Sequence, residues 1–337
     1  MNIFCPIDNF AFCGIMGVKK RLKGRCVMEK LLAGVQSGDW YDETNDDYSM
    51  ALAAKCGIEA IDYNIDHVIN PWEFVKGKAF PQCNLPVDEF VKCYSGLKEA
   101  SEKYGIVISQ MHAPFPTWFE GKPEVNEYLL SVVEKVCAVC QYVNCPAVVV
   151  HPYESGQPEK DFEINLKMYR KLMPAARKYG VKICLENTFC VFNNRIVEGS
   201  STHAEYICRL MDTLNGEAGE ELFGFCFDVG HANITGKNIR QYLNTLGKRL
   251  TVLHIHDNDG RGDKHLIPYT QTTDLWGENL ATDWEGFIAG LRDIGYEGAL
   301  SFETFRAGRH FPKEVWGEML SLVSALGRYF RNRVING

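Results

Sequence analysis

The stretch NLKMYRKLMPAARKYGVKICLEN, residues 165–187, shows the pattern that decides the fold. Its first part is amphipathic and ends at Gly180, where a glycine in the left-handed conformation is expected to cap a helix. Its second part is a short apolar run with β-branched residues, and it leads directly to the acidic residue Glu186. The stretch therefore predicts a helix followed by a buried strand.

This pairing of an amphipathic stretch with an apolar run recurs along the chain. The apolar runs are LLAGVQ (31–36), IEAIDYNI (58–65), IVISQMH (106–112), AVVVH (147–151), VKICLEN (181–187), LFGFCFD (222–228), LTVLHIHD (250–257) and GALSFET (298–304). Eight strand and helix pairs over about 300 residues predict an α/β fold, a closed parallel (β/α)8 TIM barrel in a single domain. An open, doubly wound sheet is the alternative, because periodicity does not show that a sheet closes.

The first part of the chain does not show this alternation of apolar runs and amphipathic stretches. We interpret residues 1–27 as an N-terminal extension of uncertain order, followed by the barrel in residues 28–337.

The sequence contains no apolar span of about 18 residues and no secretory leader, so we expect no membrane partner. Its 13 cysteines are interpreted as reduced thiols, which is typical of a cytoplasmic protein.

Charge and motifs narrow the class of ligand. A formal net charge of −7 argues against a nucleic-acid partner, since phosphate binding normally needs a surplus of Lys and Arg. No glycine-rich phosphate loop follows any apolar run, so dinucleotide and nucleoside triphosphate chemistry is poorly supported. A small molecule is the expected partner, and the sequence is compatible with a homo-oligomer.

Acids and histidines stand at the ends of six successive runs, from the third to the eighth. They are His112, His151, Glu186, Asp228, His254 and Glu303. In a barrel of this kind the active site lies at the carboxyl ends of the strands. Acids packed into a desolvated funnel must either protonate or share a cation. Two Glu, one Asp and one His predict a divalent metal site that suits Mn²⁺, Mg²⁺ or Co²⁺ and tolerates Zn²⁺.

Five motifs at these positions resemble the xylose-isomerase-like barrel superfamily, which includes sugar phosphate isomerases and epimerases and endonuclease-IV-like enzymes. The motifs are LENTF (185–189), FDVGHAN (227–233), HIHDN (254–258), GDKHLIP (262–268) and SFET (301–304). The resemblance covers approximately residue 28 to the C-terminus. It implies that the metal ligands are Glu186, Asp228, His254 and Glu303. His254 is preferred to His256 because the family pattern places an acid three residues after the ligand, as Asp257 stands here.

The resemblance to ketose 3-epimerases implies a metal-dependent isomerase or epimerase that acts on a small sugar, sugar phosphate or cyclitol. Glu186 and Glu303 are then the base and acid that move a proton through an enediolate. His231 corresponds to a contact with a substrate oxygen, and Arg261 is an offset counterpart of a substrate-binding arginine. Three aromatic residues are candidates to cover the apolar face of the sugar, namely Phe115, Trp118 and Phe189.

An abasic-site DNA endonuclease with a multinuclear zinc site is the alternative function. The additional zinc ligands of the endonuclease-IV-like enzymes resemble His112, His151, His231, Asp263 and His265, which are candidate substrate contacts in the isomerase interpretation. The loop after the fifth-strand glutamate is glycine-rich in that family, whereas this chain continues TFCVF (188–192). A third hypothesis is a non-catalytic sugar-binding barrel. It does not explain why both Glu186 and Glu303 are present, because binding alone needs no pair of acid and base groups.

Overall fold

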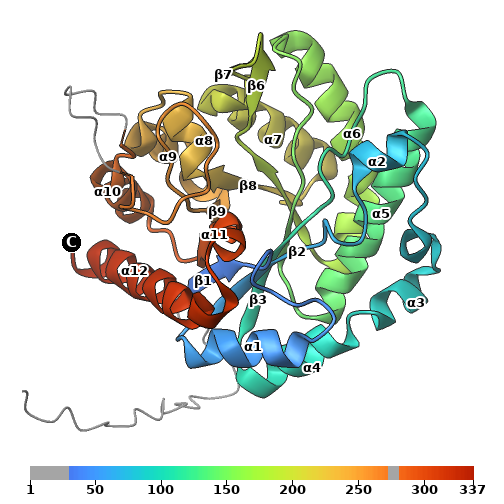
Figure 1. The fold of residues 1–337 in the computed structure, drawn as a ribbon. Helices are drawn as coiled ribbons and strands as arrows, with labels where there is room; N and C mark the ends of the chain where they lie inside the picture. The colour runs from blue at the N-terminus through green and yellow to red at the C-terminus, as the bar shows by residue number, and fades with distance from the viewer. Residues whose placement is uncertain (1–29, 272–280) are drawn as a thin grey trace, which may run out of the picture.

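The computed structural model describes residues 30–271 and 281–337, so the predicted extension, residues 1–27, lies outside the described residues. Eight parallel strands form one sheet in the order β10-β1-β2-β3-β4-β5-β8-β9. A bridge between Ile255 and Phe302 joins the two ends of this sheet, and the Ile255 N–H donates to the Ser301 carbonyl at 2.8 Å. The ring is thereby completed. The predicted (β/α)8 barrel is confirmed, and the open-sheet alternative is wrong (Figure 1).

Each barrel strand lies within one of the eight predicted apolar runs. The strands are β1 (Ala33–Gln36), β2 (Ala60–Asn64), β3 (Val107–His112), β4 (Ala147–Val149), β5 (Lys182–Glu186), β8 (Phe223–Asp228), β9 (Leu250–His254) and β10 (Leu300–Phe302). Nearly all of their residues are buried, because the barrel interior fills one face of the sheet and the helices cover the other.

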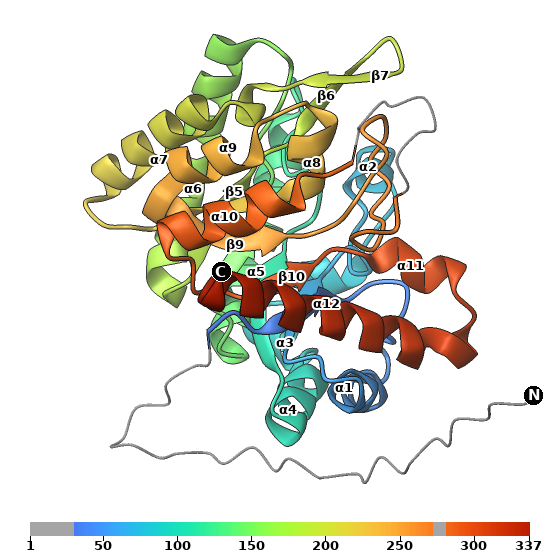
Figure 2. The same cartoon turned by 90° about the vertical axis from the view of Figure 1, so that its left-hand side faces the viewer.

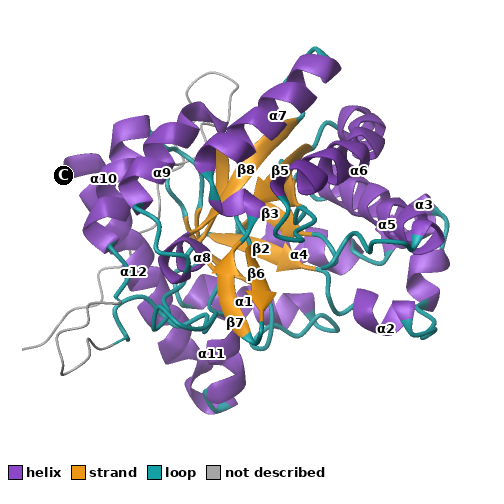
Figure 3. Cartoon of the chain, turned by 90° about the horizontal axis from the view of Figure 1, so that it is seen from above, coloured by secondary structure: helices purple, strands orange, loops and turns teal. Residues whose placement is uncertain are grey.

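The helices form an outer layer around the strands, as the view from above shows (Figure 3). They are α1 (Asp46–Lys55), α2 (Pro71–Val75), α3 (Val87–Lys92), α4 (Ser95–Tyr104), α5 (Pro123–Tyr142), α6 (Pro158–Tyr179), α7 (Ala204–Ala218), α8 (Val229–Ile234), α9 (Ile239–Leu246), α10 (Trp284–Ile294), α11 (Phe305–His310) and α12 (Trp316–Asn336). Gly105 and Gly180 end α4 and α6 in the left-handed conformation, as predicted. The described helices include none that is long and apolar enough to cross a membrane.

A β-hairpin, which none of the eight predicted apolar runs covers, follows the fifth barrel strand. It consists of β6 (Phe189–Phe192) and β7 (Arg195–Glu198), which pair antiparallel. Asn193 and Asn194 form the turn with φ of 48° and 59°, a left-handed conformation that asparagine tolerates. The hairpin projects from the body of the barrel (Figure 2). The loop after β5 is therefore an ordered structure beside the predicted site.

Candidate metal and substrate site

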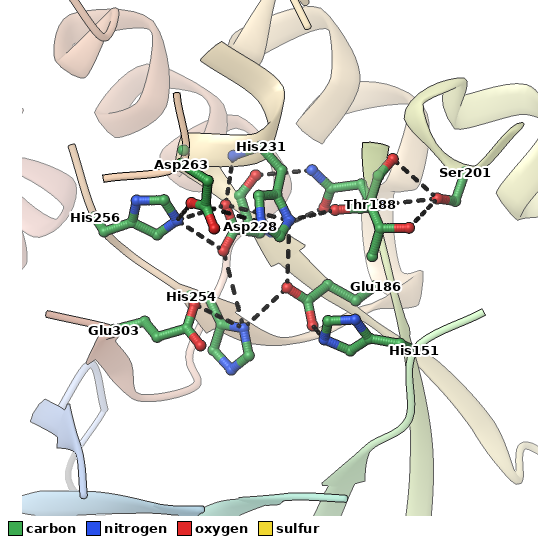
Figure 4. A network of polar contacts seen from close by, with 12 residues as sticks. His151, Glu186, Thr188, Ser201, Asp228, His231, His254, His256, Asp263 and Glu303 are labelled. Carbon is green, nitrogen blue, oxygen red and sulfur yellow. Dashed lines mark hydrogen bonds and ion pairs between the residues drawn. The ribbon is translucent and has the colours of Figure 1, made fainter. Parts of the chain in front are cut away.

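The four predicted metal ligands converge at the carboxyl ends of β5, β8, β9 and β10 (Figure 4). They are Glu186, Asp228, His254 and Glu303, and one potential ligand atom from each lies within 4.8 Å of the others. The Nδ1 atom of His254 is 3.1 Å from Glu186 Oε1, 3.5 Å from Glu303 Oε2 and 4.0 Å from Asp228 Oδ2. None of the four residues is more than 6% exposed. We call this group the central cluster.

The donor atoms of the central cluster fit a divalent cation. Three of its residues are carboxylates, and within residues 30–271 and 281–337 no Lys or Arg forms an ion pair with any of the three. Desolvated carboxylates packed together repel one another unless protons or a cation compensate their charge. Carboxylate oxygens with one imidazole nitrogen are ligands that Mn²⁺, Mg²⁺, Co²⁺ and Zn²⁺ accept.

The two glutamates of the cluster differ in how firmly they hold a proton. Burial raises the pKa of Glu303 to about 7, although His254 and His265 oppose this shift. Burial also acts to raise the pKa of Glu186, but the adjacent His151 and His254 outweigh it and hold that pKa well below its usual range. The different surroundings therefore shift the pKa values of two chemically identical side chains in opposite directions.

A pair of histidines extends the cluster on the side of Glu186. His151 Nε2 lies 2.8 Å from Glu186 Oε2, and His112 Nε2 lies 3.0 Å from His151 Nε2. His112 is the last residue of β3 and His151 lies two residues after β4. With Glu186 they form a second group whose ligand atoms lie within 4.8 Å of one another.

Another set of side chains extends the cluster on the side of Asp228. His256 Nε2 lies 3.1 Å from Asp228, and His265 Nε2 lies 2.9 Å from Asp263 Oδ2. The backbone N–H of His231 donates to Asp228 Oδ1 at 2.6 Å, at the start of α8. These residues form two further metal-capable groups, Asp228 with His231 and His256, and His256 with Asp263 and His265. His256 thus belongs to both groups, although the sequence pattern predicted no role for it.

Three polar residues on β1, β2 and β3, which were not predicted from the sequence, also contact the site. They are Gln36, Asp62 and Gln110, and each is fully buried. The Gln36 side-chain amide donates to Glu303 Oε1 at 2.9 Å, and Asp62 Oδ2 lies 3.0 Å from His254 Nε2. The sequence did contain an indication of their role, because a carboxylate or amide inside an apolar strand is rare unless it has a specific partner.

A cavity of about 690 Å³ adjoins the central cluster, and Glu186 and Glu303 are part of its wall. Aromatic side chains form much of the remaining wall, namely Trp72, Phe115, Trp118, Phe119, Tyr153, Phe189 and Phe305. They include the three predicted to cover a sugar. Arg261 is exposed and does not line the cavity. Arg306 is the single Lys or Arg among the described lining residues, and it donates to the Asp263 carbonyl at 2.7 Å.

Fold and site together define a TIM-barrel protein with buried acids and histidines at the carboxyl ends of its strands. The chain belongs to the xylose isomerase-like TIM barrel family, whose sequence profile matches residues 50–326.

Two curated relatives show what the chain is similar to in sequence. It is 27% identical over 216 residues to an uncharacterized protein, MJ1311, of Methanocaldococcus jannaschii, covering 61% of this chain and 67% of that protein. It is 25% identical over 173 residues to the inosose isomerase of Bacillus subtilis, covering 50% of this chain and 56% of the isomerase. The match thus spans little more than half the length of the isomerase.

Solved structures share the fold at lower identity. The IOLI protein, crystallised with a zinc atom, superposes with a TM-score of 0.63 and 18% identity over 91% of this chain and 98% of its own. A D-tagatose 3-epimerase-like protein superposes with a TM-score of 0.59 and 21% identity over 88% of this chain and 98% of its own.

Proposed function

We propose that this protein is a divalent-metal-dependent isomerase or epimerase that moves a proton on a small sugar, sugar phosphate or cyclitol. The observation that carries the proposal is the position of two carboxylates. Glu186 and Glu303 come from strands separated by β8 and β9 in the ring, border one cavity and approach a shared metal-capable cluster. The similarity to an enzyme named inosose isomerase supports the same class of reaction.

The residues of the site have separate tasks in this reaction. Glu186 and Glu303 take a proton from the carbon beside a carbonyl and return one, with the substrate between them. His231 lines the cavity and positions a substrate oxygen. A divalent ion in the central cluster would act as a Lewis acid that stabilises negative charge on the substrate oxygens. The aromatic wall packs on the apolar face of the ring and displaces water from it.

The test is exchange of substrate hydrogen with solvent. Metal-loaded protein in D₂O is expected to introduce deuterium at the carbon beside the carbonyl of a ketose or inosose, as followed by NMR. Glu186→Gln should lower this exchange by about 10²- to 10⁴-fold. Glu217→Gln, which alters an exposed glutamate paired with Arg170, should leave it intact. Lack of exchange by metal-loaded protein across a broad panel of ketoses and inososes would contradict the proposal.

A second candidate is a phosphodiesterase with several zinc ions that acts on abasic DNA. The observation in its favour is that metal-capable groups flank the central cluster on both sides. Against it, the described cavity wall contains a single Arg and six acidic residues, Asp66, Glu120, Glu154, Glu186, Asp263 and Glu303. DNA binding requires a surplus of positive charge. Incision of an abasic duplex, with about three zinc ions per chain by elemental analysis, would favour this candidate.

A further inference from the structure

His254 lies between two sets of carboxylates. Its Nδ1 atom faces Glu186 and Glu303, and its Nε2 atom lies 3.0 Å from Oδ2 of Asp62 on β2. His254 and Asp62 are both fully buried. The imidazole ring therefore connects the central cluster to an acid inside the barrel.

Two side-chain amides hold the carboxylate of Asp62 in place. Oδ2 accepts hydrogen bonds from the side-chain amides of Gln110 at 3.1 Å and Gln36 at 3.4 Å. Its other oxygen, Oδ1, has no hydrogen-bond partner in the described structure. His254 is the one basic residue paired with Asp62 in residues 30–271 and 281–337. A buried carboxylate with so little compensation is costly, so its position beside His254 calls for an explanation.

We propose that Asp62 is a positioning residue that keeps the proton of His254 on Nε2. A neutral imidazole carries one N–H, and an ionised carboxylate can only accept a hydrogen bond. With Nε2–H directed at Asp62, the lone pair of Nδ1 faces the three carboxylates of the central cluster. This hydrogen bond fixes the tautomer and the ring orientation that a metal ligand needs, and makes the nitrogen more basic. The inference rests on the metal site of the proposed function.

The test is the Zn²⁺ affinity of Asp62→Asn in the full chain. An asparagine can donate to Nε2, which would place the imidazole proton on Nδ1 and block that atom. We expect Zn²⁺, titrated into metal-free protein against a chromogenic chelator, to bind about 10- to 100-fold more weakly. The thermal midpoint of the metal-free variant should not fall, because the substitution removes a poorly compensated buried charge. An Asp62 that was only structural would instead lower that midpoint and leave the affinity unchanged.

Asp161→Asn is the matched control. Asp161 is also a fully buried acid, but it accepts hydrogen bonds from Ser155 and Ser200 and belongs to none of the metal-capable groups. Its Zn²⁺ affinity should equal that of the wild type.

The possible outcomes separate this inference from the proposed function. Wild type and Asp62→Asn that bind Zn²⁺ equally tightly would overturn the role of Asp62 and leave the metal site standing. A wild type that binds no Zn²⁺ would contradict both. A measurement on wild-type protein does not depend on how the variant folds: ¹⁵N NMR of the histidine rings should place the metal on Nδ1 and the proton on Nε2 of His254. Metal on Nε2 would overturn the inference.

Discussion

Glu186 and Glu303 approach the same atom from different sides of the barrel. Glu186 Oε1 lies 3.1 Å and Glu303 Oε2 3.5 Å from Nδ1 of His254. Both carboxylates are buried and line the cavity. Two acids that share so small a volume need a compensating charge, and they also present two proton-transfer groups to one bound molecule.

Neutralising either glutamate should therefore impair both metal binding and catalysis. Glu186→Gln and Glu303→Gln are each expected to weaken Zn²⁺ binding and to lower solvent exchange by about 10²- to 10⁴-fold, because each removes a ligand oxygen and a proton-transfer group. Chelator competition measures the first effect and deuterium incorporation the second. Wild-type exchange in either variant would show that the glutamate in question is not an acid or base of this reaction.

Metal removal should lower thermal stability, because the buried carboxylates then repel one another. Zn²⁺ at 100 times its dissociation constant is expected to add about 2.7 kcal/mol to the unfolding free energy. Calorimetry of chelator-treated protein at increasing Zn²⁺ should show a rising midpoint. Asp228→Asn should show a smaller rise, since it removes a carboxylate ligand from the central cluster. A wild-type midpoint independent of Zn²⁺ would argue against a resident metal.

Glu154 is expected to make stability depend on pH. Its oxygens accept hydrogen bonds from the backbone N–H groups of Ser200 and Ser201, and burial raises its pKa from 4.5 to about 7. The folded protein then holds this proton more tightly than the unfolded chain. The unfolding free energy should therefore fall by up to about 3 kcal/mol as pH rises from 4.5 through 7.

Urea denaturation of chelator-treated wild type and Glu154→Gln at pH 5 and pH 8 checks this expectation. Between pH 5 and pH 8 the unfolding free energy of the variant should fall less than that of the wild type, because glutamine does not titrate. Parallel losses in the two proteins would show that Glu154 does not carry the effect.

Gly230 should be intolerant of a side chain. A Cβ at this position in α8 would lie 1.9 Å from Cε1 of His256, so alanine must displace the ring that contacts Asp228. Gly230→Ala is expected to destabilise the protein by about 1–3 kcal/mol. Gly216 lies within α7, and apart from its chain neighbours and the adjacent helix backbone no atom lies within 4 Å of the added carbon. Gly216→Ala should therefore stabilise the protein by about 0.5–1 kcal/mol. Equal urea midpoints for the two variants would contradict this expectation.

Much of the fold could be predicted from short stretches of sequence, because the signals for strands and helices act over a few residues. Apolar runs require burial, and glycines such as Gly105 and Gly180 permit the left-handed end of a helix. The succession of strands and helices then predicted that Glu186 and Asp228 stand at the carboxyl ends of strands. In the structure these two strands pair directly. The hairpin after β5 was missed, because the short run around Phe189 gives a weak strand signal until its partner is known.

The sequence by itself therefore determined the repeated strand and helix pattern and which residue types stand at the ends of the strands. Only the tertiary structure decided closure through Ile255 and Phe302, the contact of Asp62 with His254, and the place of Arg306 rather than Arg261 in the cavity wall. These relationships join residues far apart in the chain. Their distances depend on how the barrel curves and packs, which no local preference of the backbone specifies.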